Sequence, residues 1–488
     1  MHRDGPQLIT YADRLAGDIA GVADLLDGPL AGAFAGVHLL PFFTPFDGVD
    51  AGFDPQDHTR VDPRLGTWDD VRRLADGREV MADVIVNHVS SQSAQFLDVR
   101  ERGDASPWAP MFLTLEAVFP DGATEADLAG IYRPRPGLPF TAMTLGGRRR
   151  LVWTTFTPDQ IDLDLRTTQA WEYLEQVVDA LTSGGVTMLR LDAVGYTGKE
   201  AGTDCFMTPA TDEYTERIVE LARARGAQVL VEVHGHHTQQ IEIAEKVDYV
   251  YDFALPPLVL HALTAHDLAP LAQWWTIRPA NAITVLDTHD GIGIVDVGPS
   301  DLRPGEPGLL APEQIDALVE SIHAGSGGTS RLATGAAASN LDLYQVNCTF
   351  YDALGRDDRR YLLARLVQLF VPGIPQVYYV GLLAGTNDME LLAASGVGRD
   401  VNRQHFTAAD VAAALGRGVV EDQLTALRLR TAHPAFAGEH TWSTDGTRCS
   451  LAWTNGDERA ELALDVADAS FSLRATFDGE LTTVLSAP

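Results

Sequence analysis

VTMLRLD (186–192) is the stretch that decides the fold of this chain: an apolar run that ends in a charged group. Three other runs have the same form, EVMADVIVNH (79–88), QVLVEVH (228–234) and NAITVLDTHD (281–290). Short apolar runs of this kind predict strands. Strands that each present a carboxylate at the C-terminal end are typical of the active site of an eight-stranded α/β barrel. The four runs therefore predict a barrel with an acidic site at one end.

The rest of the chain has the alternation that such a barrel requires. Helical patterns such as TWDDVRRLADG (67–77) separate the apolar runs. Eight β–α repeats predict a (β/α)8 TIM barrel of the α/β class. We expect its strands in 7–15, 36–43, 79–88, 186–194, 228–234, 246–254, 281–291 and 371–381.

Three segments depart from this alternation. Residues 86–166 and 292–355 are irregular, and the first of them is rich in Pro and Gly. From residue 436 onward, short runs separated by turn signals predict a small antiparallel β-domain. We therefore expect a barrel made of 1–85, 167–291 and 356–435, inserted domains at 86–166 (after strand three) and 292–355 (after strand seven), and a C-terminal β-domain at 436–488.

Charge and composition exclude some classes of partner. The chain has 488 residues and a net charge of −32, which argues against nucleic acid and membranes, because both bind basic surfaces. The first fifteen residues contain no apolar signal core. The three cysteines, Cys205, Cys348 and Cys449, are far apart and odd in number. Neither a disulfide framework nor a metal site is therefore expected, and we expect a cytoplasmic protein.

The charged ends of the runs suit the cleavage of a glycosidic bond. Arg190 lies two residues from Asp192, so on a strand both side chains share a face. The guanidinium favours the ionised carboxylate, which can act as a nucleophile. Glu232 ends another apolar run and can act as a proton donor. An isolated Arg-x-Asp is more often an ordinary surface ion pair, and a strand-end Glu is as often structural as catalytic, but the combination of segments favours catalysis.

In order and spacing these segments resemble the signature regions of the α-amylase superfamily (glycoside hydrolase family 13). Three more segments extend the resemblance: GVHLLP (36–41), QIDL (160–163) and GIPQVYYVG (373–381). The resemblance implies that Asp192 is the nucleophile, that Glu232 is the acid and base, and that Asp290 stabilises an oxocarbenium-like transition state. Where starch-cutting members carry a Lys-His pair whose His helps to bind calcium, this chain has Gly195 and Tyr196, so no metal is expected.

Within the superfamily, longer stretches resemble the sucrose phosphorylases. They include LPFFTPFDGVDAGFDP (40–55), LAGIYRPRPGLPFT (128–141), KEAGTDCFMTP (199–209), YDFALPPLVLHAL (251–263) and ATGAAASNLDLYQVNCT (333–349). This resemblance implies reversible phosphorolysis of sucrose by inorganic phosphate to α-D-glucose 1-phosphate and D-fructose. It implies a retaining double displacement through a covalent β-glucosyl enzyme, with two carboxyl groups about 5–5.5 Å apart. It also implies a homodimer, and no cofactor is expected.

The same resemblance assigns the binding residues. The substrate-binding residues would be Asp50, Phe53, His88, Phe156, Gln160, Arg190, Tyr196, His289 and Arg399. The acceptor site, where phosphate and fructose alternate, would contain Tyr132, Pro134, Arg135, His234, Leu341, Asp342, Tyr344 and Gln345. Arg135 is the preferred phosphate ligand, because a guanidinium binds phosphate in a bidentate way.

Other activities remain open at this level. A phosphorylase of sucrose 6'-phosphate, glucosylglycerol or glucosylglycerate would keep the same chemistry, although YRPRPG (132–137) and NLDLYQVN (340–347) favour the sucrose type. A sucrose hydrolase or transglucosidase would use water or a sugar in place of phosphate. A non-catalytic barrel that serves as a binding subunit is disfavoured, because such proteins lose the catalytic carboxylates that this chain keeps.

Overall fold

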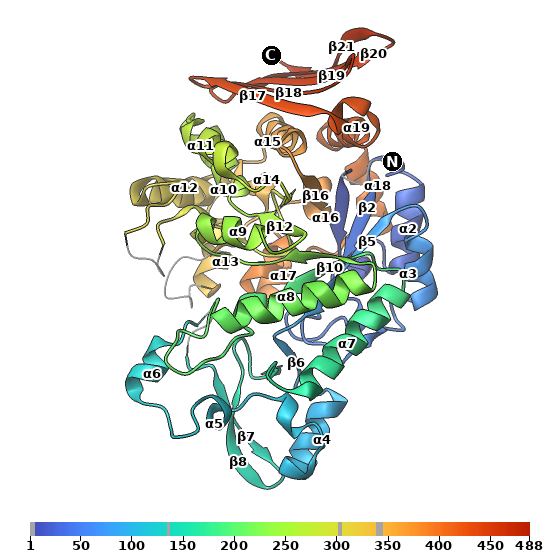
Figure 1. Ribbon diagram of the computed structural model, residues 1–488. Coiled ribbons are helices and arrows are strands. Elements are labelled where there is room, and N and C mark those ends of the chain that lie inside the picture. Colours follow the sequence, from blue (N-terminus) through green and yellow to red (C-terminus); the bar gives the residue numbers. More distant parts are fainter. Residues whose placement is uncertain (1–4, 134–136, 301–304, 338–344) are drawn as a thin grey trace.

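The chain forms a closed barrel of eight parallel strands (Figure 1). The computed structural model describes residues 5–133, 137–300, 305–337 and 345–488. Strands that follow one another in the sequence are neighbours around the barrel, and the last strand pairs with the first. The strands are β1 (Gln7–Thr10), β2 (Gly36–Leu39), β5 (Glu79–Ile85), β10 (Met188–Asp192), β11 (Gln228–Val231), β12 (Tyr249–Asp252), β13 (Ala282–Thr284) and β16 (Ile374–Tyr378). Each lies within one of the eight expected runs, which confirms the predicted fold class.

Burial on both faces explains why these strands are so apolar. Val37, Val84 and Leu189 are fully buried, as expected for parallel strands that are covered by helices outside and by packed side chains inside. The helix α7 (Thr168–Ser183) begins where the Thr167 side chain accepts a hydrogen bond from the backbone of Ala170. The larger helices of the outer layer are α2 (Ile19–Asp27), α3 (Trp68–Leu74), α7 (Thr168–Ser183), α8 (Pro209–Ala224), α9 (His237–Ala244), α10 (Leu255–Ala265), α11 (Ala269–Ile277), α15 (Asp358–Phe370) and α19 (Gly418–Ala432).

The segment after β5 forms the end of the molecule opposite the C-terminal sheet in Figure 1. Its elements are β6 (His88–Ser90), α4 (Ala94–Arg102), α5 (Leu115–Val118), α6 (Glu125–Gly130), β7 (Phe140–Leu145), β8 (Arg148–Trp153) and β9 (Gln160–Asp162). β6 pairs antiparallel with β9, so the chain returns beside the point where it left the barrel. Phe119, Ile131 and Trp153 belong to a small hydrophobic core separate from the main one.

The segment after β13 contains two helices where irregular structure was expected. They are α12 (Pro312–Gly325) and α13 (Thr329–Ala337), and they lie between β14 (Ile292–Gly293) and its antiparallel partner β15 (Gln345–Val346). Ile315, Leu318 and Ile322 recur at helical spacing, a signal of α12 that the sequence analysis passed over. The boundaries predicted for the two inserted domains, 86–166 and 292–355, remain predictions.

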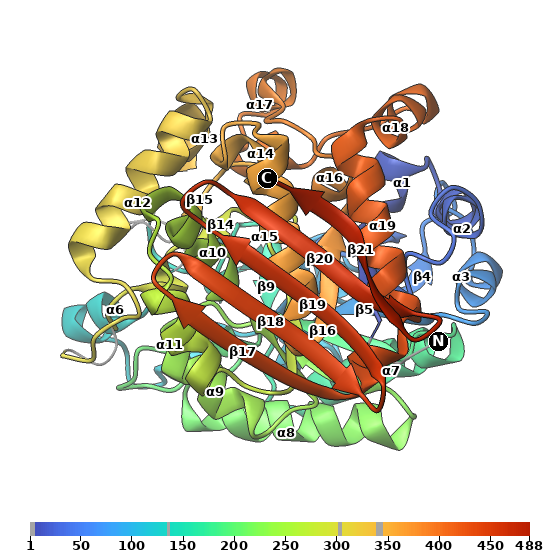
Figure 2. The same ribbon diagram turned by 90° about the horizontal axis from the view of Figure 1, so that it is seen from above.

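The C-terminal part of the chain forms a five-stranded antiparallel sheet, as predicted. Its strands are β17 (Glu439–Asp445), β18 (Arg448–Asn455), β19 (Glu458–Asp465), β20 (Ser470–Phe477) and β21 (Glu480–Ala487). Figure 2 shows the sheet lying across α15 and α19. Trp453 Nε1 donates a hydrogen bond to the carbonyl oxygen of Phe370, at the end of α15, at 2.7 Å. The sheet therefore shares a core with the barrel.

The remaining strands and α-helices are short. They are β3 (Phe43–Thr44), β4 (Asp57–Val61), α1 (Ala12–Leu15), α14 (Phe350–Ala353), α16 (Tyr379–Leu382), α17 (Met389–Ser395) and α18 (Ala408–Leu415). Among the described residues, no helix combines the length and the apolar character that crossing a membrane requires. Cys205, Cys348 and Cys449 are buried free thiols.

Candidate active site

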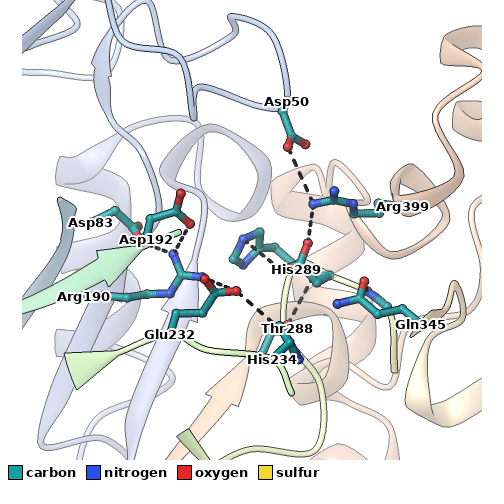
Figure 3. A network of polar contacts seen from close by, with 12 residues as sticks. Asp50, Asp83, Arg190, Asp192, Glu232, His234, Thr288, His289, Gln345 and Arg399 are labelled. Carbon is teal, nitrogen blue, oxygen red and sulfur yellow. Dashed lines mark hydrogen bonds and ion pairs between the residues drawn. The ribbon is translucent and has the colours of Figure 1, made fainter. Parts of the chain in front are cut away.

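The buried guanidinium of Arg190 organises the C-terminal ends of three neighbouring strands. Its Nη1 lies 2.5 Å from Asp83 Oδ1 and 2.9 Å from Asp192 Oδ1, and its Nη2 lies 3.6 Å from Glu232 Oε1 (Figure 3). The Arg190 side chain is 2% exposed. Because β10 pairs with both β5 and β11, the fold brings one cation and three carboxylates together.

Asp83 is a member of this group that the sequence analysis missed. It lies opposite Arg190 in the register of β5 and β10, it is fully buried, and its second oxygen lies 3.0 Å from His38 Nε2. Burial alone would raise the pKa of the Asp83 carboxyl, but Arg190 and His38 hold this pKa below its usual range. The signal was a charge inside an apolar strand, which is costly unless the charge is paired.

Asp192 and Glu232 lie at the ends of adjacent strands, and both contact Arg190. Burial raises the pKa of Asp192, Arg190 lowers it and the Glu232 carboxylate raises it, and the net effect is upward. Ala193, with a left-handed φ of 56°, turns the chain directly after β10, and its N–H donates to Glu232 Oε2 at 3.2 Å. The two carboxyl groups and the Ala193 N–H therefore lie together at one end of the barrel.

A second cluster of charged side chains, centred on Arg399, lies across the site from Arg190 in Figure 3. Arg399 Nη1 lies 2.5 Å from Asp290 Oδ1 and 3.6 Å from Asp50 Oδ2. The N–H of Asp290 donates to Thr288 Oγ1 at 3.2 Å. Arg399 therefore joins two carboxylates that are far apart in the sequence.

Two further members of this cluster, Arg403 and Asn402, were also missed. Arg403 is 1% exposed, its Nη1 lies 3.2 Å from Asp50 Oδ1, and its Nε donates to the carbonyl oxygen of His289 at 2.9 Å. Asn402 Nδ2 donates to the carbonyl oxygen of Thr288 at 2.7 Å. These bonds hold the loop after β13. Arg403 follows Arg399 by four residues, and the 3-10 helix η5 (Gly398–Asn402) brings both near Asp50.

Uncharged hydrogen-bonding side chains belong to the same site. The His289 ring stacks on Phe53, with centroids 4.9 Å apart and planes 9° apart. His88 Nε2 lies 2.9 Å from the carbonyl oxygen of Phe53, and Gln160 Nε2 donates to that oxygen at 3.2 Å. Burial lowers the pKa of His88 and of His289, so both rings are neutral at pH 7. Neutral imidazoles can both donate hydrogen bonds to and accept them from hydroxyl groups.

A row of aromatic rings continues from His88. Phe156 lies 5.4 Å from His88 and 5.0 Å from Tyr196, measured between ring centroids. Tyr132 lies 6.2 Å from Tyr196 and 4.6 Å from Phe206. Phe206 had not been expected, although its stretch of sequence had been matched. The row offers flat apolar surface with hydroxyl groups at the two tyrosines.

Only part of the expected acceptor site lies in the described chain. His234 Nε2 lies 3.7 Å from Glu232 Oε1. Gln345 accepts a hydrogen bond from the N–H of Gly291 at 3.2 Å, and the pairing of β14 with β15 brings it there. Pro134, Arg135, Leu341, Asp342 and Tyr344 lie outside the described residues.

A lysine stands where the resembled superfamily commonly binds calcium. Lys199 Nζ lies 2.7 Å from Asn87 Oδ1 and 2.6 Å from Asp162 Oδ2, and it contacts the carbonyl oxygen of Tyr196. Its side chain is 2% exposed. The ammonium already uses these oxygens, and two cations would repel each other here. A calcium ion therefore does not fit.

Comparison with known proteins adds to this geometry. Residues 6–255 match the model of the alpha-amylase catalytic domain. The chain is 54% identical to a sucrose phosphorylase of Bifidobacterium adolescentis over 94% of this chain and 92% of that protein, and 54% identical to one of Agrobacterium vitis over 97% of each. The crystal structure of sucrose 6F-phosphate phosphorylase from Thermoanaerobacter thermosaccharolyticum matches with a TM-score of 0.90 at 33% identity, over 99% of this chain and 98% of that one. The chain is therefore an enzyme of the α-amylase family, and within that family it is similar over nearly its whole length to sucrose phosphorylases.

Proposed function

We propose that the protein catalyses the reversible phosphorolysis of sucrose to α-D-glucose 1-phosphate and D-fructose. The observation that carries the proposal is the Arg190 guanidinium between Asp192 and Glu232, at the ends of adjacent strands. Two carboxyl groups that flank one bond are what glycoside cleavage requires. The identity of 54% to two sucrose phosphorylases supports sucrose as the glucosyl donor.

In the first step Asp192 attacks the anomeric carbon of the glucosyl unit, and Glu232 gives its proton to the oxygen of the departing fructose. Arg190 lies nearer to Asp192 (2.9 Å) than to Glu232 (3.6 Å), so its positive charge stabilises an ionised Asp192 more strongly than an ionised Glu232. The bond to fructose breaks as the bond to Asp192 forms, which gives a β-glucosyl enzyme. Asp290, held by Arg399, stabilises the positive charge that develops on the ring.

In the second step phosphate takes the place of fructose. Glu232, now a carboxylate, accepts the proton of the phosphate whose oxygen attacks the anomeric carbon. The attack comes from the face that fructose left, so the α-configuration is retained. We assign phosphate and fructose to Tyr132, Pro134, Arg135, His234, Leu341, Asp342, Tyr344 and Gln345, with Arg135 as the main phosphate ligand.

The glucosyl unit is assigned to the deeper part of the site. Arg399 contacts both Asp50 and Asp290, which supports a site closed behind one terminal glucosyl unit, because a longer chain would have to break these contacts. The residues assigned to this part are Asp50, Phe53, His88, Phe156, Gln160, Arg190, Tyr196, His289 and Arg399.

The working state of the enzyme is also part of the proposal. We infer a cytoplasmic homodimer that needs neither a metal ion nor an organic cofactor. Buried free thiols are typical of a reducing compartment. Light scattering after size-exclusion chromatography tests the dimer, and a mass equal to that of one chain would contradict it.

Product analysis of sucrose incubations with and without inorganic phosphate tests the reaction. We expect fructose release that depends on phosphate and an equimolar amount of α-glucose 1-phosphate. Glucose release at the same rate without phosphate would identify a hydrolase or transglucosidase instead. Reaction with sucrose 6'-phosphate but not with sucrose would favour the activity named for the structural relative, and glucosylglycerol and glucosylglycerate would be assayed next.

The phosphate assignment has its own test. Replacement of Arg135 by Ala is expected to slow phosphorolysis and to leave phosphate-independent hydrolysis of sucrose nearly unchanged, because water needs no cationic ligand. Equal losses in both reactions would contradict the role of Arg135.

A further inference from the structure

A buried carboxylate stands behind His234, outside the residues assigned so far. Asp296, in the short helix η4 (Val295–Val297), is fully buried. Its Oδ2 lies 3.0 Å from His234 Nδ1. Its Oδ1 accepts hydrogen bonds from the N–H of Gly235 at 3.2 Å and from Gln240 Nε2 at 3.0 Å. Both oxygens are thus fixed by the loop and helix that follow β11.

The ring of His234 is held on its other sides as well. It stacks on Phe253, with centroids 3.9 Å apart and planes 11° apart. Its Nε2 faces Glu232, 3.7 Å from Oε1. A Cβ atom at Gly293 would lie 2.2 Å from Asp296 Oδ2, so a residue without a side chain is needed there for the carboxylate to reach the ring.

Among the described residues, the carboxylates of Asp296, Glu232 and Asp290 lie close to the His234 ring. Burial lowers the pKa of the imidazole, but Asp296 raises it, the Glu232 and Asp290 carboxylates raise it further, and the net effect is upward. Nδ1 lies next to Asp296 and Nε2 faces Glu232.

We propose that Asp296 is a positioning residue that holds His234 as an imidazolium whose Nε2–H is directed to the acceptor side of the site. A fixed positive charge offsets the repulsion between a phosphate dianion and the carboxylates Glu232 and Asp290. Water carries no charge and needs no such cation, so Asp296 favours phosphate over water as the second substrate. The inference rests on the proposed function and adds to it a residue that acts only through His234.

Two measurements on Asp296→Asn test the proposal. The first follows the pH titration of His234 by NMR with 13C-labelled histidine, with His234→Gln used to assign the signal. The second measures, against pH, the KM for phosphate and the rate of phosphate-independent sucrose hydrolysis. Asp352→Asn is the matched control, because Asp352 is also fully buried and accepts bonds from Arg356 Nε and the N–H of Asn387 away from the residues assigned to the site.

We expect the midpoint of the His234 titration to lie above the ordinary imidazole pKa of about 6.5 in the wild type and below that pKa in Asp296→Asn. At pH 7 the KM for phosphate should rise about tenfold, the size of one lost charge-assisted hydrogen bond, and should recover toward lower pH. The rate of phosphate-independent hydrolysis should change by less than about threefold, because water carries no charge and does not need the cation. Asp352→Asn should leave the midpoint and both rates unchanged, and in a His234→Gln background Asp296→Asn should add nothing to the KM.

Several results would overturn the proposal. They are a wild-type midpoint at or below the ordinary value, a midpoint that Asp296→Asn does not move, and equal losses of hydrolysis and phosphorolysis. The titration of His234 in the wild-type protein tests the proposal even if Asp296→Asn does not fold. The titration also needs no turnover, so a failure of the proposed sucrose reaction is distinguishable from a failure of the link between Asp296 and His234.

Discussion

Replacement of Lys199 by Met tests whether a buried ammonium holds the inserted segment to the barrel. Lys199 Nζ contacts Asn87 after β5, Asp162 in β9 and the carbonyl oxygen of Tyr196 after β10. Met has a similar length and no charge, so the variant leaves the Asp162 carboxylate buried without its cation. Removing one partner of a buried ion pair costs about 3–5 kcal/mol.

This cost translates into a measurable shift of the melting temperature. The unfolding entropy is about 2 cal/mol/K per residue, hence about 1 kcal/mol/K for 488 residues. If the chain unfolds as one unit, Lys199→Met lowers Tm by about 3–5 °C, measured by calorimetry. Activity should fall as well, because the Tyr196 ring lies against Phe156 in the site.

The chain supplies its own control, because Lys246 is the only other lysine. Its Nζ lies 2.6 Å from Asp212, but the two side chains are 34% and 40% exposed, so Lys246→Met should cost less than about 1 kcal/mol. Equal shifts in the two variants would refute the argument from burial. A lower Tm of the wild type after treatment with EDTA would refute the claim that the ammonium stands in place of calcium.

Three other changes have defined outcomes. Asp192→Asn should fold normally and lose about 10⁴-fold or more in turnover, and substantial residual phosphorolysis would contradict its role as nucleophile. Arg403→Met removes the contacts to Asp50 and to the His289 carbonyl, so kcat/KM for sucrose should fall about 100-fold, as a loss of about 3 kcal/mol implies. A fall of less than about threefold would contradict a role of Arg403 in the active site. Burial lowers the pKa of His58 to about 4. The contribution of neutral His58 to the free energy of unfolding is therefore complete above about pH 6.5 and is lost as the pH falls toward 4. In denaturation experiments at several pH values, His58→Gln should reduce the change in unfolding free energy across this pH range by about 3 kcal/mol.

The strands were predictable because their signal is local. An apolar run bounded by Gly, Pro or charged residues carries its conformation in a few neighbouring side chains, and α3 likewise lies within the helical pattern TWDDVRRLADG. The positions of Asp192 and Glu232 at the ends of such runs followed from the same patterns. Even a local signal can be passed over, as the spacing of Ile315, Leu318 and Ile322 in α12 was.

The sequence by itself determined the barrel, the C-terminal sheet and the strand ends that carry the acidic residues, because each depends on short-range periodicity. Only the tertiary structure decided which side chains meet. Asp83 faces Arg190 through strand register, Arg403 reaches Asp50 from the far end of the barrel sequence, and Asp296 meets His234 from a separate loop. These contacts join residues up to 353 positions apart. No local pattern encodes them, since they arise when the closed barrel brings the C-terminal ends of all eight strands to one place.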